Sequence, residues 1–209
     1  MRYLSLLVIW MLAFSTAHPQ VSNQNINVGL LLDLPPETVA DAPELGILKN
    51  EIQNVLGTER QVNFDPSNMQ FTQGSLAHAK DAYETLVQNP QVDIIIAVGS
   101  LSATMLTSQQ KIVKPTISAG ILDPALQKMP LKKPDVSGVS NFTYILTSHT
   151  IEQDLLTLHQ LYPFKHLAVC INKDLKELFN HQNFVDQIIK PLGANAKLIF
   201  TDIDLADVD

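Results

Sequence analysis

The chain has 209 residues, of which 45% are hydrophobic, and its formal net charge at pH 7 is −7. This length is enough to bury one sizeable core or two small ones. Because the charge is acidic and the basic residues form no cluster along the sequence, the surface should repel phosphate backbones and anionic lipid, and we do not expect nucleic acid as a partner.

The N-terminus has the order of a secretory signal peptide. Arg2 precedes an apolar stretch from Leu6 to Phe14, and the small residues Ser15 and Ala17 follow it. The stretch is about half of the roughly 20 residues that a transmembrane helix needs. We therefore expect residues 1–17 to be removed on export and the mature chain to be periplasmic. An uncleaved N-terminal anchor is the alternative.

Residues 24–120 alternate between strand-like and helix-like patterns, which predicts one β-α lobe. The clearest strand, Val92–Val98, reads VDIIIAV, and such an apolar run is typical of a strand covered on both faces of a parallel sheet. Ser75 has the chemistry of a helix N-cap and precedes an apolar face at helical spacing. The alternation implies parallel strands joined by right-handed crossovers. The expected order is strand 26–32, helix 45–55, extended segment 62–64, helix 76–87, strand 92–98, helix 100–106 and strand 115–119.

A proline-containing segment separates this lobe from a second one. Residues 121–136 show no sustained period and are interpreted as the inter-lobe connection. Residues 137–209 predict a partial C-terminal lobe whose sheet has unsatisfied edges, so that self-association through this lobe or further residues would complete it. Its expected elements are an extended segment 136–144, a helix after Thr150, a strand 166–171, a helix 175–188 and a strand 197–201. The predicted fold class is α/β, with two Rossmann-like lobes that have parallel sheets, the second of them incomplete.

Three segments suggest a family. They read IIIAVGSLSA at 94–103, PTISAGILDP at 115–124 and VSGVSN at 136–141. In this order and spacing they resemble the substrate-binding proteins of ABC transporters, specifically the type I periplasmic-binding group that includes aromatic amino acid receptors. The resemblance runs from about residue 25 to residue 195. Two features depart from the family: later β-α units that finish both lobes are absent, and Ser100 stands where the family commonly has Thr.

The resemblance implies a function. Proteins of this family clamp a small molecule between two lobes, and the loaded protein docks on an ABC permease in the membrane. For this chain it implies an exported solute-binding protein without a cofactor, whose ligand is an amino acid or a related carboxylate. The exported ligand-sensing domain of a signalling system uses the same architecture and is the alternative.

The candidate site follows from the strand ends. In open parallel sheets, ligands bind outside the carboxyl ends of the strands, where the strand order reverses. At the N-terminus of the helix that follows the third strand, Ser100 and the amides of Leu101 and Ser102 should bind a ligand carboxylate. Asp33 or Asp123 should face an ammonium group of the ligand. Candidate residues at the ends of the first, third and fourth strands, and in the helix after the third, are Asp33, Leu34, Gly99, Ser100, Leu101, Ser102, Gly120 and Asp123.

Plainer roles are also open for these residues. Ser100 could only cap its helix, and Asp123 could only begin the turn before Pro124. In the second lobe, Ser140 and Asn141 follow an extended segment and could face the cleft.

A periplasmic enzyme is the less favoured class. The sequence has no G-x-S-x-G elbow, no G-x-x-x-x-G-K loop and no G-x-G-x-x-G turn. Its histidines show no short zinc-ligand spacing, so we expect neither catalysis nor a metal. Cys170 is the single cysteine, and its apolar neighbours predict a buried structural thiol.

Overall fold

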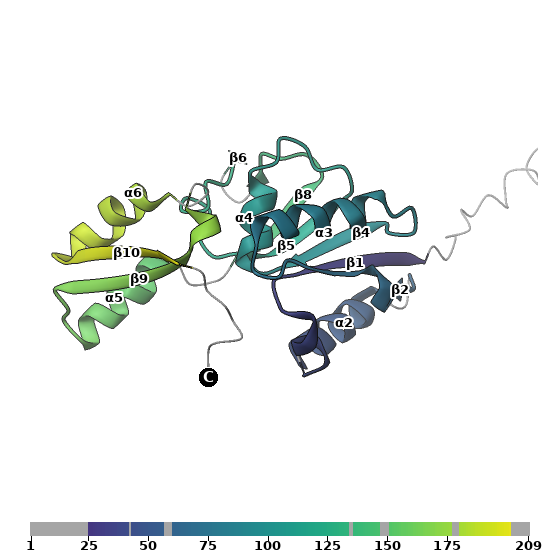
Figure 1. The fold of residues 1–209 in the computed structure, drawn as a ribbon, viewed down its shortest axis with the longest axis horizontal. Coiled ribbons are helices and arrows are strands. Elements are labelled where there is room, and N and C mark those ends of the chain that lie inside the picture. Colours follow the sequence, from purple (N-terminus) through teal and green to yellow (C-terminus); the bar gives the residue numbers. More distant parts are fainter. Residues whose placement is uncertain are drawn as a thin grey trace, which may run out of the picture.

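The computed structural model describes residues 25–41, 43–56, 60–133, 136–146, 151–176 and 180–201. The expected signal peptide, residues 1–17, lies outside the described residues, as does Thr150. The described chain forms two lobes that lie side by side (Figure 1). None of the helices it contains is long and apolar enough to cross a membrane.

The first lobe is built on a parallel sheet. Its order is β2-β1-β4-β5-β8, with β3 also paired to β1, and every pair in it is parallel. Since β2 and β3 share one edge of β1, they act as one interrupted strand, and the order is that of a doubly wound sheet. The strands are β1 (Ile26–Leu32), β2 (Val62–Asn63), β3 (Met69–Phe71), β4 (Ile94–Val98), β5 (Thr116–Ile121) and β8 (Phe142–Leu146).

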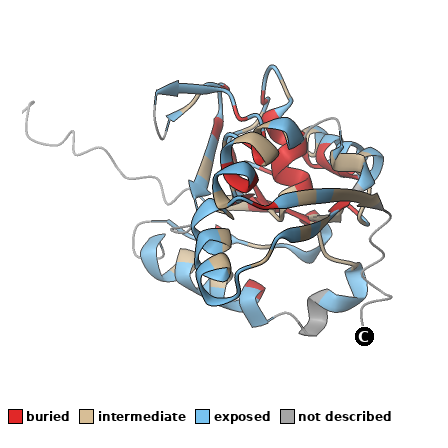
Figure 2. Ribbon diagram, turned by 90° about the vertical axis from the view of Figure 1, so that its left-hand side faces the viewer, coloured by how far each residue is buried: buried red, intermediate tan, exposed pale blue. Residues whose placement is uncertain are grey.

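Helices cover both faces of this sheet. On one face, α2 (Pro43–Leu56) packs through Leu45, Leu48 and Ile52; the other face is covered by α3 (Leu76–Gln88) and α4 (Ser100–Thr107). Seven of the eight residues of α4 are buried, as expected for a helix that is apolar or small on all sides. Buried residues, red in Figure 2, gather around this sheet and its helices. Short 3-10 turns lie at η1 (Pro36–Asp41) and η2 (Pro66–Asn68).

The end of α3 is capped by a lysine from another segment. The Nζ atom of Lys114 donates to the carbonyl oxygens of Leu86, Asn89 and Val92, with N–O distances of 3.2 Å to Leu86 and 2.7 Å to Val92. These carbonyls lie at the negative end of the helix dipole, which favours a cation. Burial nevertheless lowers the pKa of Lys114, and the Asp93 carboxylate partly offsets that effect.

The first lobe extends further along the chain than the sequence suggested. The segment expected to open the second lobe at residue 137 contains β8, which pairs in parallel with β5, with Thr116 opposite Phe142. The boundary predicted at residues 136–137 is therefore wrong for this strand. The reason is physical: a strand's local pattern shows that it is half buried but not which sheet edge it joins. Before β8, the segment that was predicted to connect the lobes forms a short antiparallel pair, β6 (Leu131–Lys133) and β7 (Val136–Ser137).

The second lobe is smaller. Its two strands, β9 (His166–Asn172) and β10 (Asn195–Thr201), pair in parallel with His166 opposite Asn195. The connecting segment includes η3 (Lys173–Leu175), α6 (His181–Asn183), η4 (Phe184–Ile189) and η5 (Lys190–Leu192), and α5 (Ile151–Leu161) precedes β9. The predicted fold class is confirmed, with a second lobe that contributes two strands among the described residues.

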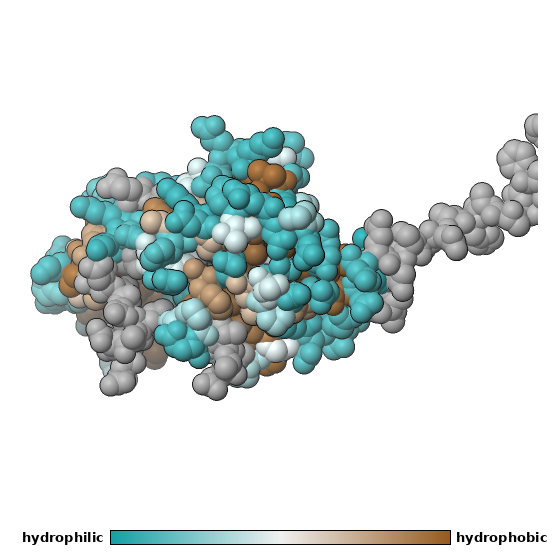
Figure 3. Space-filling model, turned by 45° about the vertical axis from the view of Figure 1, so that its right-hand side comes forward, coloured by the Kyte–Doolittle hydropathy of each residue, from teal (hydrophilic) through white to brown (hydrophobic). Residues whose placement is uncertain are grey.

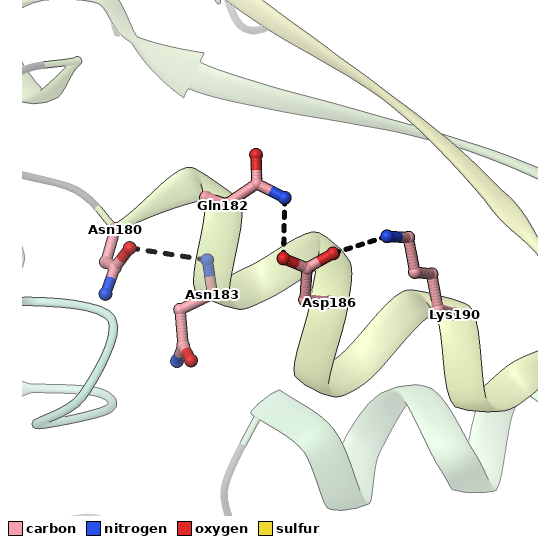
Figure 4. Close-up of polar contacts among 5 residues, drawn as sticks. All are labelled: Asn180, Gln182, Asn183, Asp186 and Lys190. Carbon is pink, nitrogen blue, oxygen red and sulfur yellow. Dashed lines mark hydrogen bonds and ion pairs between the residues drawn. The ribbon is translucent and has the colours of Figure 1, made fainter.

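Hydrogen bonds of polar side chains connect neighbouring turns of the helical segment between β9 and β10 (Figure 4). The Oδ1 atom of Asn180 accepts a hydrogen bond from the Asn183 amide at 3.3 Å and caps the start of α6. One turn on, the Asp186 carboxylate accepts from Gln182 Nε2 and from Lys190 Nζ, each at 2.6 Å. The Lys190 interaction lowers the pKa of Asp186. α6 therefore begins at His181, after its N-cap Asn180, whereas the predicted start at 175 falls in η3.

Candidate functional site

The tips of β1 and β4 meet where the strand order of the first lobe reverses. These strands are neighbours, with Leu32 opposite Val98, yet the connections that leave them pass to opposite faces of the sheet. The ladder continues one residue further, because the Asp33 amide donates to the Val98 carbonyl at 3.0 Å. This is the position at which doubly wound sheets place their ligands.

The Asp33 carboxylate binds the N-terminus of α4. Its Oδ2 atom lies 2.7 Å from the Leu101 amide nitrogen, and both of its oxygens lie 3.1 Å from the Ser102 amide nitrogen. Burial raises the pKa of Asp33, while the hydrogen bonds from Ser102 and Leu101 act in the opposite direction. Asp33 thus acts as the anion at this helix N-terminus.

This geometry corrects the carboxylate hypothesis. The amides of Leu101 and Ser102, which the sequence analysis assigned to a ligand carboxylate, are occupied by a carboxylate of the chain itself. The Asp33 carboxylate is engaged by these amides, and the expectation that Asp33 or Asp123 faces an ammonium group stays a prediction. A helix N-terminus favours any anion. Here the anion is a carboxylate of the chain itself, which the neighbouring strand tip holds next to the helix.

Two glycines make this close arrangement feasible. Gly99 has φ +124°, and a Cβ atom built on it would lie 2.2 Å from Asp33 Oδ2. A Cβ on Gly120, at the end of β5, would lie 1.9 Å from the Gly99 carbonyl oxygen. Side chains at either position would therefore collide with the neighbouring strand tip. At Gly99 the neighbour that approaches closely is Asp33.

Beside these tips lies a cavity of about 550 Å³ between the two lobes. Of the predicted residues, Ser100 and Asp123 line it. The first lobe also contributes Thr104, Leu122, Leu126 and Gln127, and the second contributes Ile151, Leu155, Leu167, Ala168, Val169, Cys170, Ile171, Leu175 and Phe184. Leu34 is half-buried beside the strand tips, outside this lining.

The second-lobe wall runs along one strand. Five consecutive residues of β9, from Leu167 to Ile171, line the cavity. Because successive side chains of a strand point to opposite faces, a cavity that touches all five reaches the edge of the strand. Among the described strands β9 pairs with β10 alone, so this is the edge without a neighbouring strand.

A network of hydrogen bonds holds the first-lobe wall in place. Asp123 Oδ1 accepts hydrogen bonds from the amides of Ala125 and Leu126, both at 2.9 Å. Asp123 therefore begins the turn at Pro124, which was the plainer of its two expected roles. Gln127 is buried, and its Oε1 atom accepts from the amides of Leu122 and Asp123 at 2.7 and 3.1 Å. Its Nε2 atom donates to Thr104 Oγ1 at 2.9 Å and so ties this loop to α4.

Three sequence expectations about the second-lobe side need correction. Ser140 and Asn141 are exposed and lie before β8, and Asn141 Nδ2 donates to the carbonyls of Ile112 and Val113 before β5. Since β5 and β8 are parallel, this is the amino end of the sheet, opposite the strand tips, so neither residue faces the cleft. Cys170 is exposed and lines the cavity instead of being buried, because the edge of β9 is uncovered there.

The two lobes are joined by direct contacts. The Asp174 carboxylate, in η3, accepts from the Leu76 amide at 2.8 Å and caps α3, whose own N-cap residue Ser75 makes no side-chain cap bond. The Asn180 amide donates to the Leu126 carbonyl at 2.7 Å. Leu126 also packs in the apolar cluster of the second lobe. The lobes are therefore in direct contact next to the cavity.

The fold and this inter-lobe cavity define a class of architecture: a two-lobed α/β protein of the type I periplasmic-binding type. No family model matches the sequence, and no curated protein matches it. Solved structures do match. A conserved domain protein from Vibrio cholerae has 18% identity and a TM-score of 0.58, with 87% of this chain and 58% of that one covered.

Two further structures agree with this fold. A periplasmic binding protein from Burkholderia mallei matches with 12% identity and a TM-score of 0.57, over 88% of this chain and 48% of that one. An ABC transporter substrate-binding protein from Aeropyrum pernix matches with 15% identity and a TM-score of 0.54, over 86% and 46%. The chain thus shares the fold of periplasmic binding proteins, and it spans between 46% and 58% of the length of these structures.

Proposed function

We propose that this chain is part of an exported solute-binding protein that captures a small molecule between its lobes and delivers it to an ABC permease. The observation that carries the proposal is the cavity of about 550 Å³ beside the strand tips, walled by α4 and its neighbouring loop on one side and by β9 on the other. Pockets of this size, at a switch point and between two lobes, are the usual place for small ligands in α/β proteins.

The names of two matching structures support the proposal. One is described as a periplasmic binding protein and the other as a substrate-binding protein of an ABC transporter. Both are binding proteins, and the described residues of this chain contain no group of three or more metal-ligating side chains. In this proposal the ligand is held and released unchanged, in the periplasm. Ser100 and Asp123 are the predicted site residues that would lie nearest to it.

The experiment uses Cys170, the single cysteine of the chain, as a reporter. A bound ligand should raise the melting temperature, because it binds the folded state, and should slow the alkylation of Cys170 by N-ethylmaleimide. We would screen amino acids and small neutral molecules for compounds that produce both effects, and then recover each ligand to establish that it is unchanged. A ligand that raises the melting temperature without protecting Cys170 would place binding elsewhere and contradict the proposal.

A matched pair of variants locates the binding. Ala168→Trp places a bulky side chain on the cavity wall, whereas Lys197→Trp places it on β10, directly opposite Ala168 in the strand register and outside the cavity lining. We expect the first variant to abolish ligand binding and the second to retain it. Equal binding by both would contradict a ligand site in this cavity.

A further inference from the structure

We propose that the inter-lobe cavity binds a largely apolar molecule that carries no anionic group, and that it discriminates against carboxylates. This inference rests on the proposed function and names the chemical class of its ligand. It reverses the expectation from sequence, in which the N-terminus of α4 would hold a carboxylate.

The first step concerns the donors that an anion would need. The two α4 amides that point toward the strand tips, those of Leu101 and Ser102, bind the Asp33 carboxylate at 2.7 to 3.1 Å. A ligand carboxylate could reach them only by displacing Asp33, whose place is fixed by the ladder bond from its own amide to Val98. The positive end of the helix dipole is therefore already neutralised.

The second step concerns three of the four polar side chains of the lining; the fourth, Ser100, carries an uncharged hydroxyl. Asp123 is engaged by two backbone amides, and Gln127 uses both its oxygen and its nitrogen within the loop and toward Thr104. The Thr104 hydroxyl in turn donates to the Ser100 carbonyl at 2.6 Å. These groups stabilise the wall, and using them for a ligand would break bonds already made.

The third step is the charge of the cavity. Eleven of its fifteen lining residues are apolar, counting Cys170, and one, Asp123, is an acid. None of the described lining residues is lysine, arginine or histidine. An anion moved from water into such a lining loses hydration without gaining a counter-charge, and the nearby carboxylates of Asp33 and Asp123 repel it. An uncharged molecule meets neither penalty.

The edge of β9 indicates which polar groups the ligand can carry. A strand edge offers alternating amide hydrogens and carbonyl oxygens, so it matches a hydroxyl or an amide, which both donates and accepts. A carboxylate would be attracted to the amides but repelled by the adjacent carbonyls. Together with the apolar walls, this favours an apolar body with one uncharged hydrogen-bonding group.

Three molecules with one skeleton test this inference: 3-phenylpropanol, 3-phenylpropylamine and 3-phenylpropionate. Their dissociation constants would be measured from the concentration at which each halves the rate of Cys170 alkylation by N-ethylmaleimide. We expect the alcohol to bind. The amine, a cation at neutral pH, should bind comparably, because the carboxylates of Asp33 and Asp123 attract it and offset its loss of hydration. The propionate should bind at least about tenfold more weakly, the ratio that corresponds to about 1.4 kcal/mol. Propionate binding as tight as that of the alcohol would overturn the inference and leave the proposed function standing.

A charge substitution sharpens the test. Leu122 lines the cavity but is 46% exposed, so a lysine there should not disturb folding. Leu122→Lys should strengthen propionate binding about tenfold and weaken amine binding, whereas Leu131→Lys, at a leucine that is 45% exposed and outside the cavity lining, should change neither. If none of the three molecules protects Cys170 or raises the melting temperature in any of these proteins, the inference fails, and the wider screen of amino acids and small neutral molecules decides the proposed function separately.

Discussion

The two lobes are built from the same β-α units but are covered to different extents. In the first lobe, β1 has neighbours on both edges, and separate apolar clusters cover the two faces of the sheet. In the second, β9 has β10 as its one described neighbour, and none of the residues of α5 is buried. A β-α unit therefore acquires a full core only when strands flank it and helices cover both faces.

The second lobe takes part of its core from the first. Its apolar cluster includes Leu126, which is fully buried and belongs to the loop after β5. Large apolar side chains such as Leu161 and Tyr162 remain exposed there, at 68% and 73%. The face shown in Figure 3 is mostly hydrophilic, with hydrophobic areas between the hydrophilic side chains. We therefore expect the second lobe to open before the first when the protein is heated or treated with denaturant.

The largest effect should come from Gly120→Ala. Its Cβ would lie 1.9 Å from the Gly99 carbonyl oxygen, and since that atom belongs to the backbone, a strand must move. We expect the free energy of unfolding of the first lobe to fall by about 3 kcal/mol, which urea denaturation would measure. The control is Gly46→Ala, because that position has open space and lies inside α2, where alanine should stabilise by about 0.5–1 kcal/mol. Equal effects of the two substitutions would contradict the strand-tip contact.

Asp33→Ala should have the next largest effect. It leaves the amides of Leu101 and Ser102 without their acceptor at the start of α4, which should cost about 2 kcal/mol in the free energy of unfolding. Chemical denaturation at neutral pH would measure this cost. If the lobes depend on each other as described, the second lobe should lose stability in the same variant, whereas an unchanged second lobe would show that it is independent.

The same carboxylate predicts a dependence on pH. Burial raises the pKa of Asp33 above 3.8, so the folded state binds its proton more tightly than the unfolded state does. The stabilising contribution of this bound proton is therefore complete below pH 3.8 and is lost as the pH rises through the folded-state pKa, whereas the hydrogen bonds from the α4 amides remain. Relative to the wild type, Asp33→Asn should gain stability over that interval, as measured by denaturation at a series of pH values. A constant difference would contradict the raised pKa.

Lys114→Met should affect the first lobe more mildly. It removes the cation that binds the Leu86, Asn89 and Val92 carbonyls, and because Lys114 is only half-buried we expect a cost of about 1 kcal/mol. Hydrogen exchange should show the loss at the end of α3. Lys111→Met is the matched control, since Lys111 is exposed, and it should leave the stability unchanged.

The smallest effect concerns the contact between the lobes. Asp174→Ala removes the cap that the second lobe supplies to α3, at a cost of about 0.5 kcal/mol. We expect faster hydrogen exchange in the second lobe and around Leu76, with no change in the central sheet. Asp154→Ala, at an exposed position on α5, is the control. Slower exchange in the second lobe after Asp174→Ala would contradict a stabilising bond between the lobes.

Much of the fold could be predicted from local patterns. The apolar run at 92–98 and the alternation before and after it place β1, β4, β5, β9 and β10 within a few residues of their observed bounds. The sheet to which β8 belongs could not be predicted, because strand pairing depends on distant edges that local propensity does not encode.

The candidate site was only partly predictable. Glycines and an aspartate after successive strands correctly indicated that the tips of β1, β4 and β5 come together. The sequence could not distinguish a ligand carboxylate from that of Asp33, because helix amides bind either. The role of Gln127 was missed, since a glutamine in an irregular loop carries no pattern; its position four residues after Asp123 is a signal only once a turn is known.

The uncovered edge of β9 has a consequence for handling the protein. While the lobes are in contact, this edge borders the cavity and other chains have little access to it. Separation of the lobes would present a row of unsatisfied peptide groups to solvent, and such rows promote β-aggregation between molecules. Conditions that part the lobes, such as dilute denaturant, should therefore favour precipitation, and a ligand that bridges the lobes should keep the protein in solution.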